Sequence, residues 1–101
     1  MTAKRRVEVT DAASAQIVAA SAWWEQHRPS ALGAVAEDLD RILALLVVQP
    51  EMGMPARSTR LPEVRRIALT RIRYYLYYRA TATAIQVLAF WHTSRGGQRP
   101  L

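Results

Sequence analysis

The chain has no cysteine and only two histidines among its 101 residues. Without cysteine there is no disulfide and no thiolate chemistry, and two isolated histidines do not make a zinc site. The sequence also lacks a Gly-rich phosphate loop, and no serine lies in the sequence context of a nucleophile elbow. We therefore expect a protein without a metal site or a cofactor.

Long apolar segments are missing as well. No apolar run follows the basic N-terminus as it would in a signal peptide, and the longest run, residues 42–48, is far shorter than the roughly 20 residues of a membrane span. With 50% hydrophobic and 22% charged residues, the composition is that of an ordinary globular protein. The sequence predicts a cytoplasmic protein with a single domain over residues 1–101.

Acidic residues are scarce in the C-terminal half. From Arg57 onward there are nine arginines and one acid, Glu63, a net charge of +8. The first 56 residues hold five Lys and Arg against seven Asp and Glu, a net of −2, so that the whole chain carries +6. This segregation indicates an acidic partner, which could be nucleic acid, a protein surface or an anionic membrane. The alternative is a basic surface that only keeps the protein soluble.

The N-terminal half has the periodicity of a strand and two helices. Residues 6–10 alternate polar and apolar like a short strand, after which Thr10 or Asp11 can cap a helix over residues 12–27. Arg28-Pro29-Ser30 ends that helix, so we expect an antiparallel helix hairpin. The buried stripe of the first helix is predicted at Ala13, Ile17, Ala20 and Trp24. That of the second, which ends before Pro50, is predicted at Leu32, Val35, Leu39, Ile42 and Leu46.

The C-terminal half is strand-like. Prolines and a glycine punctuate residues 50–62 and predict a loop, and strands are predicted over residues 64–69, 72–79 and 85–91, followed by a tail over 96–101. The link at residues 80–83 lacks the Gly, Asn or Asp typical of a turn. The predicted fold is α+β in the order β-α-α-β-β-β, with the helix hairpin on one face of a mostly antiparallel sheet.

Side chains of a strand alternate between its faces, which divides residues 71–79 into two rows. One row suits the core under the helices: Ile72, Tyr74, Leu76 and Tyr78. The other row is predicted on an open face: Arg71, Arg73, Tyr75, Tyr77 and Arg79. Guanidinium groups pair with phosphate and flat rings stack on bases, so the second row could bind single-stranded RNA. Cross-strand packing of the tyrosines beside solvated arginines explains the same pattern equally well.

Three further positions could take part in a site. Arg65 and Arg66 are adjacent and point to opposite faces, so only one of them can join the arginine row. His92 ends the last predicted strand and could act as general acid or base in RNA cleavage, with Arg73 stabilising the phosphorane. Taken alone, a strand-end histidine bonded to the main chain is the better explanation. The parity of this strand is ambiguous, because His92 is in step with Leu88 and Phe90.

Trp23 and Trp24 are adjacent on the first helix, so one should be buried and the other could anchor an interface. His27 ends the same helix, where its charged form interacts favourably with the helix dipole.

The order and spacing of several segments resemble the RelE/ParE superfamily of bacterial toxins from type II toxin–antitoxin modules. The resemblance covers nearly the whole chain and implies a helix hairpin on a curved antiparallel sheet. The segments that carry it are Val7-Glu8-Val9-Thr10 with Ala13, Pro50-Glu51-Met52-Gly53, Val64-Arg65-Arg66-Ile67, the run from Arg73 to Arg79, and the run from Ile85 to His92 with Arg95-Gly96.

The resemblance implies one of two targets. RelE-like members cleave mRNA, usually in the ribosome, and Arg73 and His92 fall at positions similar to their catalytic set. ParE-like members poison DNA gyrase and lack a full catalytic set. No glutamate follows Gly53 as in some of the ribonucleases, and Thr93 stands where a tyrosine is often found, so we favour the ParE-like branch. An inactive relative that survives as a binding module is the third alternative.

Both branches imply a cognate antitoxin, for which the +8 half favours an acidic C-terminal segment. Neither a cofactor nor a membrane is implied. The residues predicted to bind the target are Arg66, Arg71, Arg73, Tyr75, Tyr77, Arg79, His92 and Arg95. Those predicted to bind the antitoxin are Trp23, Trp24, Arg65 and Arg73.

Overall fold

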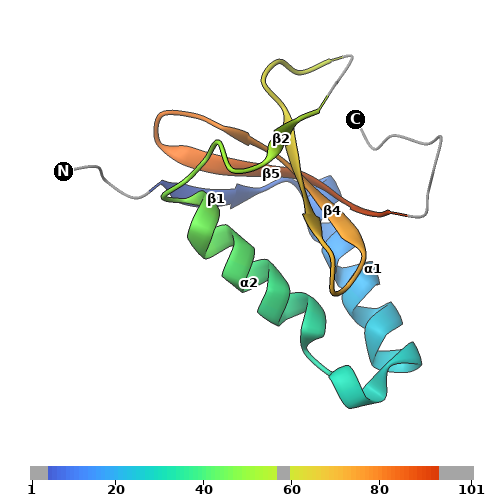
Figure 1. The fold of residues 1–101 in the computed structure, drawn as a ribbon. Coiled ribbons are helices and arrows are strands. Elements are labelled where there is room, and N and C mark those ends of the chain that lie inside the picture. Colours follow the sequence, from blue (N-terminus) through green and yellow to red (C-terminus); the bar gives the residue numbers. More distant parts are fainter. Residues whose placement is uncertain (1–4, 57–59, 94–101) are drawn as a thin grey trace.

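The computed structural model describes residues 5–56 and 60–93, so that Arg95 and the predicted tail at 96–101 lie outside the described residues. The elements follow in the order β1 (Arg6–Val9), α1 (Asp11–His27), the short 3₁₀ helix η1 (Pro29–Ala31), α2 (Ala34–Leu46), β2 (Met54–Pro55), β3 (Arg65–Leu69), β4 (Tyr74–Ala80) and β5 (Ala84–His92). They form two layers, a sheet and a helix hairpin whose tip points away from it (Figure 1). This confirms the predicted α+β fold.

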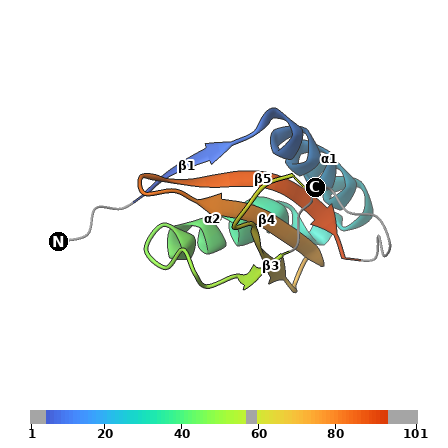
Figure 2. The same cartoon turned by 90° about the horizontal axis from the view of Figure 1, so that it is seen from above.

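The sheet has five strands in the order β1-β5-β4-β3-β2. β1 runs parallel to β5, and the other neighbours are antiparallel. The view from above shows the long β4–β5 hairpin in the middle of this layer, with β1 along one side of it (Figure 2). The two-residue strand β2 lies within the segment that was predicted to be a loop, and no periodicity can be read from so short a strand.

The first helix forms as its sequence predicts. Of the two candidate caps, Thr10 is the one used, because its Oγ1 accepts from the main-chain N–H of Ala13 at 3.1 Å. The predicted stripe faces the sheet: Ala13 and Ala20 are buried, and Ile17 and Trp24 are partly buried against the core.

The second helix begins later than predicted. Leu32 lies before it and is exposed, so its assignment to the buried stripe is wrong. Gly33 precedes the helix with a φ of 79°, a left-handed conformation that glycine adopts without steric cost. The rest of the stripe is confirmed: Val35, Leu39 and Leu46 are buried, and Ile42 is partly buried.

The strand predicted over residues 72–79 also begins later. Residues 70–73 form the turn between β3 and β4, closed by the Arg73 N–H, which donates to Leu69 O at 2.8 Å. Arg73 itself takes a left-handed φ of 62°. Arg71 and Arg73 therefore do not belong to the strand, and the parity count fails for both.

A bulge interrupts the pairing of β4 with β5. Tyr77 pairs with Ala89 while Tyr78 pairs with Val87, so Leu88 is an extra residue with no partner of its own. The bulge reverses the parity of β5, since one inserted residue turns every later side chain to the other face. Ile85 and Val87 face the helices before the bulge and Phe90 does so after it, whereas Leu88 and Ala89 lie in a cluster on the opposite face.

The β4–β5 turn is stabilised by a threonine, which replaces the Gly, Asn or Asp that a turn usually contains. Thr81 Oγ1 accepts from the main-chain N–H of Thr83 at 3.3 Å and of Ala84 at 3.0 Å. The Thr81 N–H donates to Ala84 O at 2.8 Å. A threonine hydroxyl can thus replace the usual turn residues.

Candidate functional site

The face of the sheet turned away from the helices, called the outer face below, is partly covered by the chain itself. A second apolar cluster is built on it, with buried Val64, Tyr77, Leu88 and Ala89 and with partly buried Ala56, Leu61, Tyr75 and Trp91 around them. Ala56 N–H donates to Val64 O at 2.8 Å, and both residues pack in this cluster. The outer face is therefore not the open surface that the alternation of residues predicted.

The two tyrosines of the predicted binding row pack in this cluster. Tyr77 is only 8% exposed, and its ring meets that of Tyr75 edge-on with centroids 6.2 Å apart. The guanidinium carbon of Arg66 lies 4.3 Å from the centroid of the half-buried Tyr75 ring. Stacking on a base requires a ring face that is open. The buried Tyr77 ring therefore fits cross-strand packing and not base stacking, and one face of the Tyr75 ring is occupied by Arg66.

Arg66 is thus the one of the two adjacent arginines that joins the outer face. Arg65 points to the helix side, where its Nη1 donates to the main-chain oxygens of Gly53 at 2.7 Å and Glu51 at 3.3 Å. Arg65, one of the residues predicted to contact an antitoxin, therefore holds the loop after α2 in place.

The same loop is fixed by Tyr78, which is fully buried. Its hydroxyl donates to Pro50 O at 2.8 Å and accepts from the Gly53 N–H at 2.9 Å. Burial raises the pKa of this phenol, since the charged form would lose its hydration. The Pro-Glu-Met-Gly segment therefore has a structural role in this chain.

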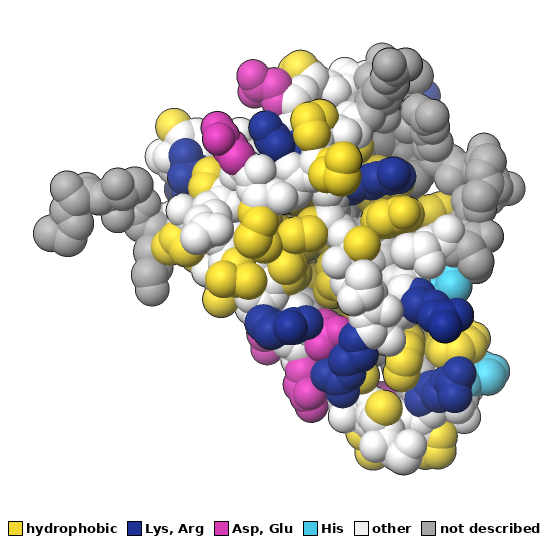
Figure 3. Space-filling model, in the orientation of Figure 1, with side chains coloured by type: hydrophobic (Ala, Val, Ile, Leu, Met, Phe, Trp, Pro, Cys, Tyr) yellow, Lys and Arg dark blue, Asp and Glu magenta, His cyan; other side chains and the backbone are white. Residues whose placement is uncertain are grey.

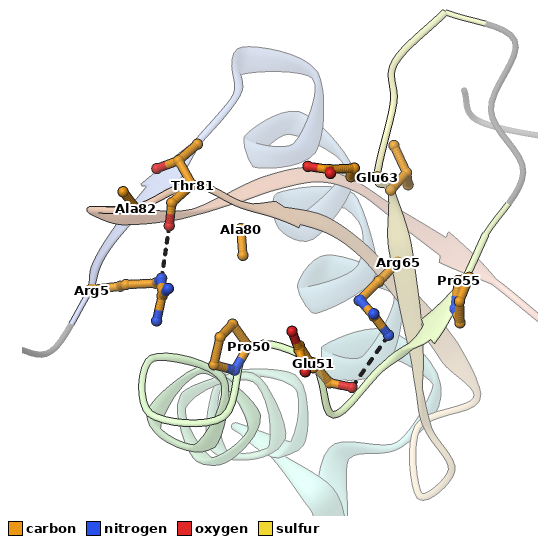
Figure 4. A pocket seen from close by; sticks show the side chains of 10 residues that line it. Arg5, Pro50, Glu51, Pro55, Glu63, Arg65, Ala80, Thr81 and Ala82 are labelled. Atoms are coloured by element: carbon orange, nitrogen blue, oxygen red, sulfur yellow. Dashed lines mark hydrogen bonds between the residues drawn. The ribbon is translucent and has the colours of Figure 1, made fainter. Parts of the chain in front are cut away.

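Beside this loop lies a cavity of about 510 Å³. Arg5 and Arg65 enter it from opposite sides, and Pro50 and Ala80 lie between them (Figure 4). Arg5 Nε donates to Thr81 O at 2.7 Å. Because Glu51 and Glu63 also line it, the cavity has no excess of either charge.

Arg71 lies on the helix side of the sheet, so its assignment to the outer row is wrong. Its Nη1 is 3.1 Å from Asp38 Oδ1 and 3.4 Å from Glu37 Oε2, both on α2. Asp38 is only 2% exposed, and Arg41 Nη2 is 3.5 Å from the same Oδ1. The ion pair ties the β3–β4 turn to α2. Asp38 is not among the residues predicted from the sequence, although its place three residues after the buried Val35 could have indicated its burial.

Arg73 and His92 lie at the same end of the sheet. Arg73 O accepts from the Thr93 N–H at 2.9 Å, which places the arginine beside the end of β5. The His92 ring meets Tyr74 edge-on at 5.1 Å, and Tyr74 stacks on buried Phe90 at 4.6 Å. His92 is therefore turned toward the helix side and away from Arg66 and Tyr75. The sequence left open which face of the sheet His92 takes, and the bulge at Leu88 turns it to the helix side.

Arg79 belongs to a polar row across the outer face. Its Nη2 donates to Gln86 Oε1 at 3.1 Å, and Gln86 Nε2 donates to Glu8 Oε1 at 3.2 Å. Arg6 Nη2 is 2.9 Å from Glu8 Oε2, and this arginine and Gln86 hold the pKa of the Glu8 carboxyl below its usual value. Arg79, one of the predicted target-binding arginines, thus already pairs with Gln86 in a row that crosses three strands.

The helix hairpin carries the other predicted contact residues. Trp24 is half-buried against the core, and Trp23 is 44% exposed, so the pair divides as expected. The Trp23 ring stacks on His27 with centroids 4.3 Å apart, and His27 Nδ1 donates to Trp23 O at 2.9 Å. Trp23 is a preformed aromatic surface near the tip of the hairpin.

Comparisons with known proteins identify the family. The model of a family described as "ParE toxin of type II toxin-antitoxin system, parDE" matches residues 7–96. The chain belongs to the ParE toxin family. A solved structure titled "Chromosomal ParDE TA system from P. aeruginosa" matches with a TM-score of 0.71 and 23% identity, over 90% of this chain and 98% of that chain. No curated protein matches in sequence. The ParE-like assignment and the type II toxin class are thereby confirmed.

In this ParE-family chain, the predicted target-binding residues other than Arg95, which is not described, divide into three places: the outer face, the end of the sheet and the side of α2. On the side of the molecule seen in Figure 1, basic side chains alternate with apolar ones and do not form a continuous stripe (Figure 3). Within residues 5–56 and 60–93 there is no group of three or more His, Asp or Glu that could hold a metal ion. No helix in those ranges is long and apolar enough to cross a membrane.

Proposed function

We propose that this toxin inhibits growth by binding DNA gyrase and stabilising its cleaved complex with DNA, without breaking any bond itself. The observation that carries the proposal is the match of residues 7–96 to the ParE toxin family, and the row predicted to bind RNA, Arg71 to Arg79, does not lie together on one open face. Arg71 is paired with Asp38, Tyr77 is buried, and His92 is turned to the helix side of the sheet. General acid–base chemistry requires such groups within reach of one substrate atom.

The proposal includes neutralisation by a cognate antitoxin with an acidic C-terminal segment. Arg73 is exposed and has no carboxylate partner among the described residues, so an acidic segment could pair with it. Trp23 offers an exposed ring of the kind that anchors interfaces. Trp24 and Arg65 are less accessible, since the first packs on the core and the second holds the loop after α2.

A supercoiling assay tests the proposal. Purified toxin should inhibit ATP-dependent supercoiling of a relaxed plasmid by gyrase, and protease treatment after detergent should release linear DNA from the trapped complex. His92→Ala should inhibit to the same extent as the unaltered chain, because the proposal gives this histidine no chemical role. Normal supercoiling with toxin in stoichiometric excess over gyrase would reject the proposal.

Ribosome-dependent mRNA cleavage is the second candidate function. The bond from Thr93 N–H to Arg73 O favours it, because it keeps Arg73 beside the end of the strand that carries His92. This candidate predicts mRNA fragments in a cell-free translation reaction, and loss of the fragments in Arg73→Ala and His92→Ala while both variants remain folded. If expression without antitoxin affects neither growth nor translation, an inactive binding module becomes the better explanation.

A further inference from the structure

The two edges of the sheet differ in how they meet solvent. One edge ends in β2, which has two residues, and the second of these is Pro55. A short strand with a proline discourages further pairing, because proline has no N–H to donate. The other edge is β1, a four-residue strand without proline, lysine or a bulge. Among the described residues, the β1 edge is therefore more open to another strand than the β2 edge.

The outward main-chain groups of β1 can be assigned from its pairing with β5. Arg6 N–H donates to Thr83 O at 3.0 Å and Thr10 N–H to Val87 O at 3.1 Å, so these residues and Glu8 between them point inward. The N–H and C=O groups of Val7 and Val9 point outward, since alternate residues of a strand point to opposite sides. Among the described residues, no bond outside the sheet involves these groups.

We propose that β1 pairs antiparallel with β1 of a second copy of this chain, about a two-fold axis through Val7. In this register the two Val7 residues form a hydrogen-bonded pair, and Arg6 of each copy lies opposite Glu8 of the other. Directly opposite residues in such positions are close enough for their side chains to interact, and opposite charges there stabilise the pairing. The segment Arg6-Val7-Glu8 is thus complementary to itself.

The polar row of the outer face supports this register. Gln86 pairs with Glu8 and Arg79 with Gln86 in the strand registers, so the row Arg79–Gln86–Glu8 crosses the sheet and ends at the β1 edge. Arg6 of a second copy would continue this row across the axis. A register shifted to place Glu8 opposite Glu8 would set two carboxylates against each other, which is unfavourable.

The opposite face of the edge adds apolar surface. Val7 is 39% and Val9 45% exposed. The end of α2 lies next to the start of β1, where Arg5 N–H donates to Val47 O at 3.4 Å, and Val48 is exposed just beyond it. Pairing about the axis would join the two sheets and remove part of these side chains from water.

A strand from an acidic partner fits this edge less well than a second copy does. A strand of carboxylates would set an acid opposite Glu8, whereas a second copy sets Arg6 there. The self-complementary charges therefore favour association of the toxin with itself, independently of its target. Val9 would lie opposite Arg5, whose N–H already donates to Val47 O, so the main-chain pairing is limited to the two bonds between the Val7 residues. The dimer should therefore be weak and dependent on concentration.

Sedimentation equilibrium over a concentration series tests the proposal on the purified chain. The mass should rise from the 11.4 kDa of one chain toward twice that value. Arg6→Glu alone and Glu8→Arg alone each put like charges opposite one another, so each should weaken self-association by at least about tenfold. Met54→Lys, a charge change on the opposite edge, should leave self-association unchanged.

Mixing the two charge variants makes the test specific. An equal mixture of Arg6→Glu and Glu8→Arg restores opposite charges at both positions and should form a heterodimer, and the double variant R6E/E8R should self-associate like the unaltered chain. This recovery would also show that the single variants are folded. A wild-type chain that stays monomeric at every concentration, or variants that do not recover on mixing, would overturn the proposal.

Discussion

The loop after α2 should be intolerant of any side chain at Gly53. A Cβ built on Gly53 would lie 2.6 Å from Tyr78 Oη, 2.8 Å from Tyr78 Cε1 and 2.9 Å from the main-chain oxygen of Arg66. None of these atoms can move easily, since Tyr78 is fully buried and the third atom belongs to the backbone of β3. Gly53→Ala must therefore displace either the loop or the strand.

The expected loss has two parts. Forcing an extra methyl group into a packed site costs about 1–3 kcal/mol. A displaced loop also loses the hydrogen bond from Gly53 N–H to Tyr78 Oη, now 2.9 Å long, which contributes about 1 kcal/mol. We expect Gly53→Ala to lower the free energy of unfolding by about 2–4 kcal/mol, a large part of the ~5–15 kcal/mol of a typical domain.

Urea denaturation followed by tryptophan fluorescence measures this loss, and thermal unfolding should show a melting temperature lower by roughly 4–8 °C per kcal/mol. Tyr78→Phe completes a double-mutant cycle. Alone it should cost about 1–3 kcal/mol, because Gly53 N–H and Pro50 O lose their partner. The double variant should be less destabilised than the sum of the singles by about 1 kcal/mol, since the closest clashing atom is then absent.

If the losses in free energy of unfolding from Gly53→Ala and Tyr78→Phe simply add in the double variant, the expected contact between Gly53 and Tyr78 is refuted. A Gly53→Ala chain that unfolds at the wild-type urea concentration would refute the reasoning more broadly, because it would mean that the loop can accommodate a methyl group without cost.

Three other outcomes are expected. Because burial raises the pKa of Tyr78, the phenol loses its proton at a lower pH in the unfolded chain than in the folded one. The free energy of unfolding should therefore fall above about pH 10, and it should fall by more than in Tyr78→Phe. Urea titrations at several pH values measure this difference. Arg71→Ala should destabilise the chain by about 1–3 kcal/mol and Arg41→Ala by less than about 1 kcal/mol, because Arg71 is the closer partner of buried Asp38; equal losses in denaturation would contradict this. Thr81→Ala should lower the free energy of unfolding by about 1 kcal/mol, because it removes the acceptor of the β4–β5 turn. Thr81→Ser keeps a hydroxyl and should retain most of that stability in the same assay.

Most of the fold could be predicted from local patterns. The stripe of α2 identified a helix because Val35, Leu39 and Leu46 recur at its period, and the two candidate caps, Thr10 and Asp11, marked the start of α1. Strand boundaries were less predictable. Arg71 and Arg73 continue the polar–apolar alternation of β4 although they lie in a turn, because alternation does not distinguish a strand from the turn that precedes it.

The candidate site was harder to predict, since it depends on which face each side chain takes. Counting by twos assumes an uninterrupted strand, and the extra residue Leu88 reverses the count for His92. Tyr77 is buried in a cluster with Val64, and Leu61 packs against the same cluster, although both residues lie well apart from Tyr77 in sequence. Neither effect leaves a mark on the local sequence around these residues.

By itself, the sequence determined the helix hairpin, the segregation of charge and the similarity to the RelE/ParE toxins, since these depend on residue order and short-range spacing. The tertiary structure alone decided which arginines share a surface. It pairs Arg71 with Asp38, places Arg66 on Tyr75, and leaves Arg6 and Glu8 at an open edge. The physical reason is that charge and composition are properties of the chain, whereas the partner of each charge is set by turns, bulges and strand order that bring distant residues together.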